Sequence, residues 1–152
     1  MASGVAKVKG NRGKKMKTIT IETKINAPIE KVWEYWNEPE HITGWAFASD
    51  DWEAPAAEND LRVGGKFKTT MAAKDKSESF DFTGVYTVVN VNQLIEYDLV
   101  DGRHVKVEFT EVPGGVKVVE TFDPENENPN EMQSSGWQAI LDNFKKYVES
   151  NK

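Results

Sequence analysis

The segment that decides the fold is "PNEMQSSGWQAILDNFKKYVES", residues 129–150 of the 152-residue sequence. Its apolar positions recur every three or four residues, at Met132, Gly136, Trp137, Ile140, Leu141, Phe144, Tyr147 and Val148. This spacing predicts an amphipathic helix with a single apolar stripe. A helix over residues 129–150 is long enough to lie across a whole sheet.

The residues before this helix predict an antiparallel sheet. Residues 17–26 alternate apolar and polar side chains, and strand-like runs follow at 66–73, 79–91, 94–100, 104–112 and 116–122. Asp101-Gly102 and Gly114-Gly115 are typical of hairpin turns, and strands joined by so few residues pair antiparallel. The apolar face of such a sheet has to be covered, and only the long helix has the length to do so.

Two short helices and an irregular segment are expected between the first strand and the rest of the sheet. Pro28 suits the first turn of one helix, Pro39 ends it, and "EPEHITGW" predicts a second short helix. Residues 46–62 are expected to form an irregular polar loop that carries large aromatic side chains. The overall prediction is an α+β domain in which a curved sheet wraps the long helix and leaves space between them.

"DLRVGGKF", residues 60–67, raises the question of a phosphate-binding loop. Such a loop needs Gly-x4-Gly-Lys-Ser/Thr, but Asp60 stands at the first glycine position and Phe67 at the hydroxyl position. We therefore expect Gly64 and Gly65 to supply a bulge or a positive φ where a strand starts, and Gly84 to kink a later strand.

Charge and composition exclude several classes of function. Residues 1–15 hold five basic residues and no acid, and we interpret them as a disordered basic arm or an appended leader; residues 16–152 form one domain. The net charge of −6 argues against nucleic acid and stable membrane association. The chain has no cysteine and no secretory leader is recognised, so a cytoplasmic location and a monomer or weak dimer are expected.

Several blocks together resemble a known superfamily. "INAPIEKVWEYWNEPEHITGW" (25–45) resembles the opening of the helix-grip superfamily (SRPBCC), which includes START domains, polyketide cyclases and birch-pollen-type allergens. "DLRVGGKF", "FDFTGVYTVVNVNQLIEYDL", "GGVKVVETF" and "GWQAILDNFKKYVE" resemble the branch named for the activator of heat-shock protein 90 ATPase (AHSA1-like). The resemblance implies a seven-stranded antiparallel sheet gripping a C-terminal helix. It also implies a cavity that many relatives use for lipids, sterols or polyketides, but not one particular reaction.

Candidate ligand-contacting residues follow from strand and helix periodicity. Phe67, Thr69 and Met71 share one face of a strand, and the aromatic trio at 45, 47 and 52 is expected to cover a mouth. Core filling is the alternative for every aromatic residue. The full candidate set is Trp45, Phe47, Trp52, Phe67, Thr69, Met71, Phe80, Phe82, Tyr97, Leu99, Val107, Phe109, Glu120, Trp137 and Leu141.

Glu120 is the one candidate catalytic residue. It shares a period-2 face with Val116, Val118 and Phe122, so an inward face would bring a carboxyl group into apolar surroundings and raise its pKa. That group could act as general acid or base. The alternatives are that Glu120 points to solvent, or that it is buried and satisfied by a Tyr or Arg.

Metal and hydrolase sites are not indicated. His41 and His104 are isolated, residues 123–131 are acidic but lack the order of a calcium loop, and no Gly-x-Ser-x-Gly occurs. We expect no cofactor. The favoured function is binding of a hydrophobic or aromatic small molecule between sheet and helix. The alternatives are a polyketide-cyclase-like enzyme using Glu120 or Tyr97 and, by resemblance, a chaperone-associated interaction domain.

Overall fold

The computed structural model describes residues 18–151, so the expected arm at 1–15 lies outside the described residues. Seven strands form one antiparallel sheet in the order β1-β7-β6-β5-β4-β3-β2. The elements are β1 (Ile19–Ile25), α1 (Ile29–Asn37), α2 (Pro39–Ile42), β2 (Trp52–Asn59), β3 (Lys66–Ala73), β4 (Ser79–Asn90), β5 (Leu94–Leu99), β6 (His104–Val112), β7 (Gly115–Phe122) and α3 (Asn130–Ser150). The predicted α+β helix-grip fold is confirmed.

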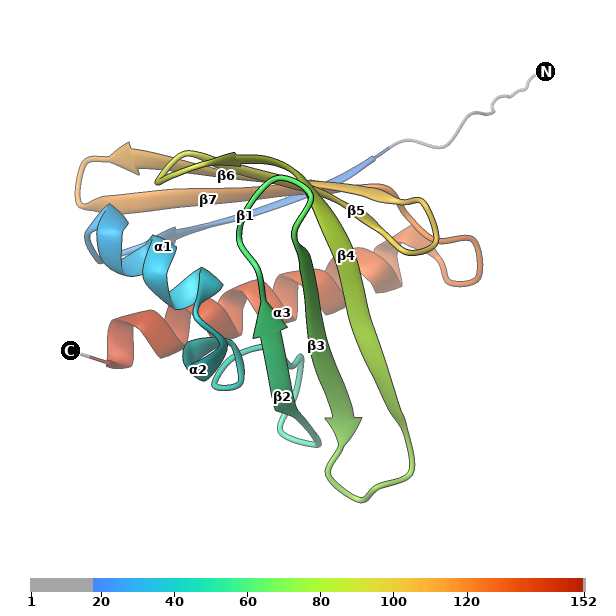
Figure 1. The fold of residues 1–152 in the computed structure, drawn as a ribbon. Coiled ribbons are helices and arrows are strands. Elements are labelled where there is room, and N and C mark those ends of the chain that lie inside the picture. The colour runs from blue at the N-terminus through green and yellow to red at the C-terminus, as the bar shows by residue number, and fades with distance from the viewer. Residues whose placement is uncertain (1–17, 152) are drawn as a thin grey trace.

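The sheet curves around α3 (Figure 1). β1, β5, β6 and β7 lie above the helix in this view, while β2, β3 and β4 run down past it. The short helices α1 and α2 lie beside the part of α3 that ends at the C-terminus. The curvature therefore gives the sheet a concave face that holds α3.

The segment 46–62 is only in part the irregular loop that the sequence predicts, because residues 52–59 form β2. This edge strand pairs with β3 alone, and its register shifts between Glu53 and Ala56. Pro55 and three alanines hide the apolar–polar alternation that marks the other strands. An edge strand tolerates Pro55 because one of its sides makes no ladder hydrogen bonds.

Gly64 and Gly65 act on the backbone, as predicted, whereas Gly84 leaves room for a neighbouring side chain and does not interrupt the pairing of β4 with β3. Gly64 has φ +85°, a conformation that side chains rarely adopt, and a Cβ on Gly65 would lie 2.0 Å from the carbonyl oxygen of Asp60. A Cβ on Gly84 would lie 2.8 Å from the ring of Phe67 on the neighbouring strand. Gly64 and Gly65 let the chain turn into β3, and Gly84 leaves room for the ring of Phe67 to lie against β4.

One part of the interior is closely filled. Phe144 of α3 has no exposed surface, and its ring packs edge-on against Trp36 at 4.9 Å and Trp45 at 4.7 Å between centroids. On β6, Phe109 contacts Trp33 at 5.3 Å in the same manner. The C-terminal half of α3 therefore lies on a continuous aromatic core made with α1.

Candidate ligand-binding cavity

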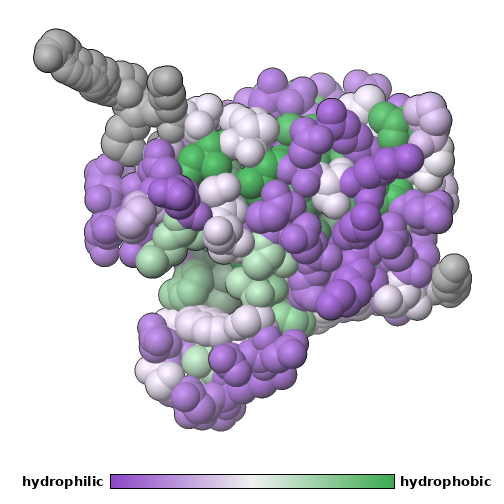
Figure 2. Space-filling model, turned by 180° about the vertical axis from the view of Figure 1, so that it is seen from behind, coloured by the Kyte–Doolittle hydropathy of each residue, from purple (hydrophilic) through white to green (hydrophobic). Residues whose placement is uncertain are grey.

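A cavity of about 300 Å³ lies between the concave face of the sheet and the N-terminal half of α3. Figure 2 shows a hollow with apolar walls, which opens on this face of the molecule. Its volume is at the lower end of the range for small-molecule pockets. The structure therefore leaves room for a compact ligand.

The strand register brings the aromatic wall of the cavity together. Thr69 pairs with Phe82 and Met71 with Phe80 across β3 and β4, so these four side chains share the concave face. The ring of Phe67 contacts Phe82 at 5.7 Å between centroids. Alternation along two neighbouring strands is thus enough to build this wall.

Helix α3 supplies the opposite wall through Trp137. Its indole stacks on Phe122 of β7, with centroids 3.8 Å apart and an interplanar angle of 11°. The edge of the same ring meets Phe82 at 5.9 Å. Trp137 therefore connects the helix to two strands and is held in place beside the cavity.

The structure places the candidate residues in two groups. Those that line the cavity are Trp45, Phe67, Thr69, Met71, Phe80, Phe82, Tyr97, Glu120 and Trp137. Those that lie elsewhere are Phe47, Trp52, Leu99, Val107, Phe109 and Leu141. The last four of these are buried in the core, while Trp52 lies 6.0 Å from Phe80 at the edge of the sheet.

Sequence reasoning missed about half of the wall. The additional lining residues are Trp36, Ile42, Ala46, Asn59, Tyr86, Arg103, Glu125, Gln133 and Ile140. Tyr86 continues the period-2 face of Phe82, so alternation could have identified it. Arg103 and Glu125 belong to connecting loops, where no periodicity points to a cavity.

The polar side chains at two places in the wall are satisfied within the protein. Tyr86 donates a hydrogen bond to Asn59 Oδ1 at 2.5 Å, and Asn59 Nδ2 donates to the carbonyl oxygen of Asn37 at 2.7 Å. Gln133 Oε1 accepts from the backbone N–H of Glu125 at 2.8 Å, and its Nε2 donates to nearby carbonyl oxygens. These groups hold α1, β2 and the β7–α3 loop in position.

Glu120 differs from them. Its side chain points inward with Val116, Val118 and Phe122, and it is 6% exposed. Within residues 18–151 its carboxyl group makes no hydrogen bond or ion pair. Removal from water disfavours the charged form and raises the pKa of Glu120 to about 8. At neutral pH the carboxyl group is therefore mostly protonated.

Tyr97 lies on the same concave face, on β5, and is also 6% exposed. Burial raises the pKa of its hydroxyl well above the usual value, and the neighbouring Glu120 raises it further. Arg103 lies at the same cavity, and its Nε donates to Asp101 Oδ2 at 2.8 Å. The cavity is thus mainly apolar, with several polar groups distributed over its wall.

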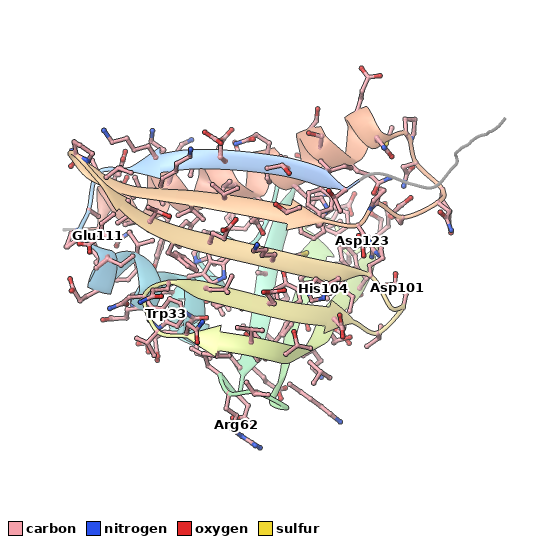
Figure 3. All side chains as sticks on the ribbon, turned by 90° about the horizontal axis from the view of Figure 1, so that it is seen from above. Trp33, Arg62, Asp101, His104, Glu111 and Asp123 are labelled. Atoms are coloured by element: carbon pink, nitrogen blue, oxygen red, sulfur yellow. The ribbon has the colours of Figure 1, made fainter. Side chains whose placement is uncertain are left out.

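The two histidines lie away from the cavity lining. His104 is on the outer face of the sheet, near Asp101 and Asp123 at one end of the strands (Figure 3). Its Nδ1 is 2.6 Å from Asp98 Oδ1 and its Nε2 is 2.7 Å from Glu96 Oε1. His41 stacks on Tyr35, with centroids 3.8 Å apart. Each ring is held by local partners.

Residues 26–149 match the family described as "Activator of Hsp90 ATPase homolog 1-like protein". The chain belongs to this AHSA1-like family. An AHSA1-like protein from Aeromonas hydrophila, solved by solution NMR, is 48% identical with a TM-score of 0.83, over 88% of this chain and 92% of that one. A protein from Cytophaga hutchinsonii is 58% identical with a TM-score of 0.77, over 88% and 93%.

More distant structures share the fold of this AHSA1-like chain alone. A protein from Nitrosomonas europaea is 17% identical with a TM-score of 0.78, over 90% of this chain and 96% of that one. No curated protein matches the chain at a significant level. Among residues 18–151, none of the helices combines the length and the apolar character needed to cross a membrane.

Proposed function

We propose that the chain binds a small, mainly apolar molecule in the cavity between the sheet and the N-terminal half of α3. The observation that carries this proposal is the cavity of about 300 Å³ itself, with aromatic and aliphatic side chains on opposite walls. An apolar wall in contact with water is unfavourable, and a ligand that covers it gains that free energy. The role that follows is sequestration or transport of the ligand.

The family supports the same function in general terms. The fold of AHSA1-like proteins commonly binds hydrophobic ligands, and this chain matches the family over most of its length. The aromatic wall also favours flat or ring-containing ligands, because Phe82 and Trp137 face each other edge-on at 5.9 Å. These considerations support the ligand class but name no compound.

Native mass spectrometry of the purified protein tests the proposal directly, because a bound molecule adds its own mass. A thermal-shift screen with lipids, flavonoids and polyketide-like aromatics follows. A ligand at one hundred times its Kd stabilises the protein by about 2.7 kcal/mol, which raises Tm measurably. A screen in which no ligand class raises Tm, together with no co-purified mass, would contradict the proposal.

A pair of variants separates cavity binding from binding elsewhere. Met71→Trp places a large ring in the cavity wall, whereas Val91→Trp adds the same ring at a turn residue that is 65% exposed. We expect Met71→Trp to abolish the shift in Tm and Val91→Trp to retain it. Equal shifts in both variants would place the ligand outside this cavity.

A second candidate function is favoured by Glu120. A buried carboxyl group with a raised pKa and no partner is typical of general acids and bases, which supports a polyketide-cyclase-like reaction. Mass spectrometry of a bound ligand after incubation would detect turnover, and Glu120→Gln should abolish that turnover while binding persists.

Two expectations from the sequence, a chaperone partner and a cytoplasmic location, stay predictions.

A further inference from the structure

Glu120 and Tyr97 are buried side chains of the cavity wall that make no hydrogen bond within residues 18–151. Glu120 of β7 and Tyr97 of β5 lie on the strands that flank β6, and both line the cavity. Each is 6% exposed. In the part of the chain from 18 to 151, neither side chain forms a hydrogen bond. Their polar atoms therefore face the cavity itself.

This arrangement is informative because both side chains are buried while their polar atoms face the space of the cavity. Water or a ligand in that space has to supply their hydrogen-bond partners. Elsewhere in the wall, Tyr86 bonds to Asn59 at 2.5 Å, whereas Thr69 of β3 is a third buried hydroxyl without a side-chain hydrogen bond among residues 18–151. A ligand with a suitable polar group supplies the partner that Glu120 and Tyr97 lack.

The charges around the two side chains indicate what kind of partner fits. Burial holds Glu120 mostly protonated at neutral pH, and Tyr97 keeps its proton because its pKa lies well above the ordinary value. Tyr86 on β4 also remains protonated, since its pKa is raised. Arg103 is the cation at the wall, and Glu125, whose pKa is lowered, is the anion.

We propose that Glu120 and Tyr97 form a two-donor subsite that holds the carbonyl oxygen of a ketone, aldehyde or ester on an otherwise apolar ligand. This inference rests on the proposed function and adds a polar group to the ligand. Each O–H donates one hydrogen bond, and a carbonyl oxygen has two lone pairs to accept them. Paired donors of this kind also stabilise negative charge that develops on such an oxygen.

Ligands with other polar groups fit the subsite less well. An ammonium group offers no acceptor to two O–H donors, and Arg103 at the same wall repels it. A carboxylate has to lose its water in the same surroundings that already oppose the ionisation of Glu120, and Arg103 offsets that cost only in part because its Nε already donates to Asp101. A neutral carbonyl oxygen accepts both bonds without bringing a charge into the cavity.

The test compares three probes of equal chain length: 2-decanone, decylamine and decanoate. Their Kd values are measured by isothermal titration calorimetry with the whole chain at pH 6.5 and 9.5. We expect 2-decanone to bind most tightly at pH 6.5 and about tenfold more weakly at pH 9.5, where the ionised Glu120 no longer donates.

Variants of both donors supply the matched controls. Glu120→Gln keeps an N–H donor without an ionisable group, so its affinity for 2-decanone should stay within about threefold of the original at both pH values. Glu120→Leu and Tyr97→Phe each remove one donor, so each should weaken binding about fivefold to tenfold at pH 6.5. Circular dichroism at each pH verifies that all variants are folded.

The outcomes separate the subsite from the cavity. If 2-decanone binds Glu120→Leu and the unchanged chain equally, the cavity binds apolar molecules but the two-donor subsite is wrong. Tighter binding of decylamine or decanoate than of 2-decanone also overturns it. If all three probes fail to bind and the thermal-shift screen succeeds with other ligands, only the carbonyl preference is lost. If none of the three probes binds and the thermal-shift screen also finds no ligand, the proposed function is overturned as well.

Discussion

The two halves of α3 face interiors of different density. In the C-terminal half, Leu141, Phe144 and Val148 have no exposed surface and pack on the core. In the N-terminal half, Gln133, Trp137 and Ile140 border the cavity. The same helix is thus enclosed at one end and borders a hollow at the other.

The difference does not come from smaller side chains at the hollow end. Phe67, Phe82 and Trp137 are as large as Phe109 and Phe144, which fill the other end. In Figure 1, β2, β3 and β4 run down past α3 and away from the line of the other strands, while α1 and α2 lie beside the C-terminal half of α3. The path of the backbone, more than residue size, decides where the cavity lies.

The largest expected effect concerns the hollow end and Glu120. The folded protein holds the Glu120 proton up to about pH 8, whereas an unfolded glutamate releases it near the ordinary value of 4.5. Between these pH values the folded state binds more protons, so stability falls as pH rises. Glu120→Gln has no carboxyl group and should not show this fall. Between pH 5 and pH 9, the free energy of unfolding of the unchanged chain should therefore decrease by about 4 kcal/mol relative to that of Glu120→Gln, as measured by urea unfolding. The same pH dependence of the unfolding free energy in both proteins would contradict the burial of Glu120.

The next effect compares two phenylalanines. Phe144→Ala at the filled end should cost about 4 kcal/mol, because it removes a ring that has no exposed surface and is packed on all sides. Phe82→Ala at the cavity should cost about 1–2 kcal/mol, because that side chain already borders empty space. Urea unfolding of both variants measures the difference. Equal losses would mean that the two ends are packed alike.

Adding one methyl group at a glycine tests the same comparison from the other direction. A Cβ on Gly44 would lie 2.4 Å from the Tyr147 ring, so Gly44→Ala should lose about 2 kcal/mol by overpacking. Gly136→Ala places its methyl in open space within a helix, so it should gain about 0.5–1 kcal/mol. A loss of stability in Gly136→Ala would contradict the open space beside this glycine.

The smallest effect belongs to the outer face of the sheet. Hydrogen bonds to Asp98 and Glu96 raise the pKa of His104. The protonated ring therefore stabilises the folded state fully below about pH 6.5, and this stabilisation disappears as pH rises through the higher folded pKa. The side chain is 40% exposed, so the pairing contributes roughly 0.5–1 kcal/mol. His104→Gln should be less stable at pH 6 and unchanged at pH 9. A difference in stability between the two proteins that is the same at pH 6 and pH 9 would mean that the charge of His104 has no role.

Much of the fold could be predicted from period-2 and helical patterns. Alternation alone gives the shared face of Glu120 with Val116, Val118 and Phe122, and the shared face of Phe67, Thr69 and Met71, but it left open whether the Glu120 face points inward. β2 was missed because Pro55 and neighbouring alanines carry no clear alternation. Strand periodicity identifies which side chains point inward, but not how closely they approach the helix.

The cavity itself is the part that local patterns do not contain. Leu141 lies one helical turn from Trp137 on the same stripe, yet Leu141 is enclosed and Trp137 borders the hollow. Val107 and Phe109 obey the same alternation as Tyr97, but they lie in the closed core. Arg103 and Glu125 reach the wall from loops. Distances between distant elements, which depend on the curvature of the whole sheet, separate these cases.

Pro55 has one more consequence, for behaviour at high concentration. It lies in β2, the last strand of the sheet, and it interrupts the row of N–H groups that this strand offers to the outside. The shifted register beside it disrupts the row further. A second molecule therefore meets a broken template for strand addition, which is a common defence against fibril growth.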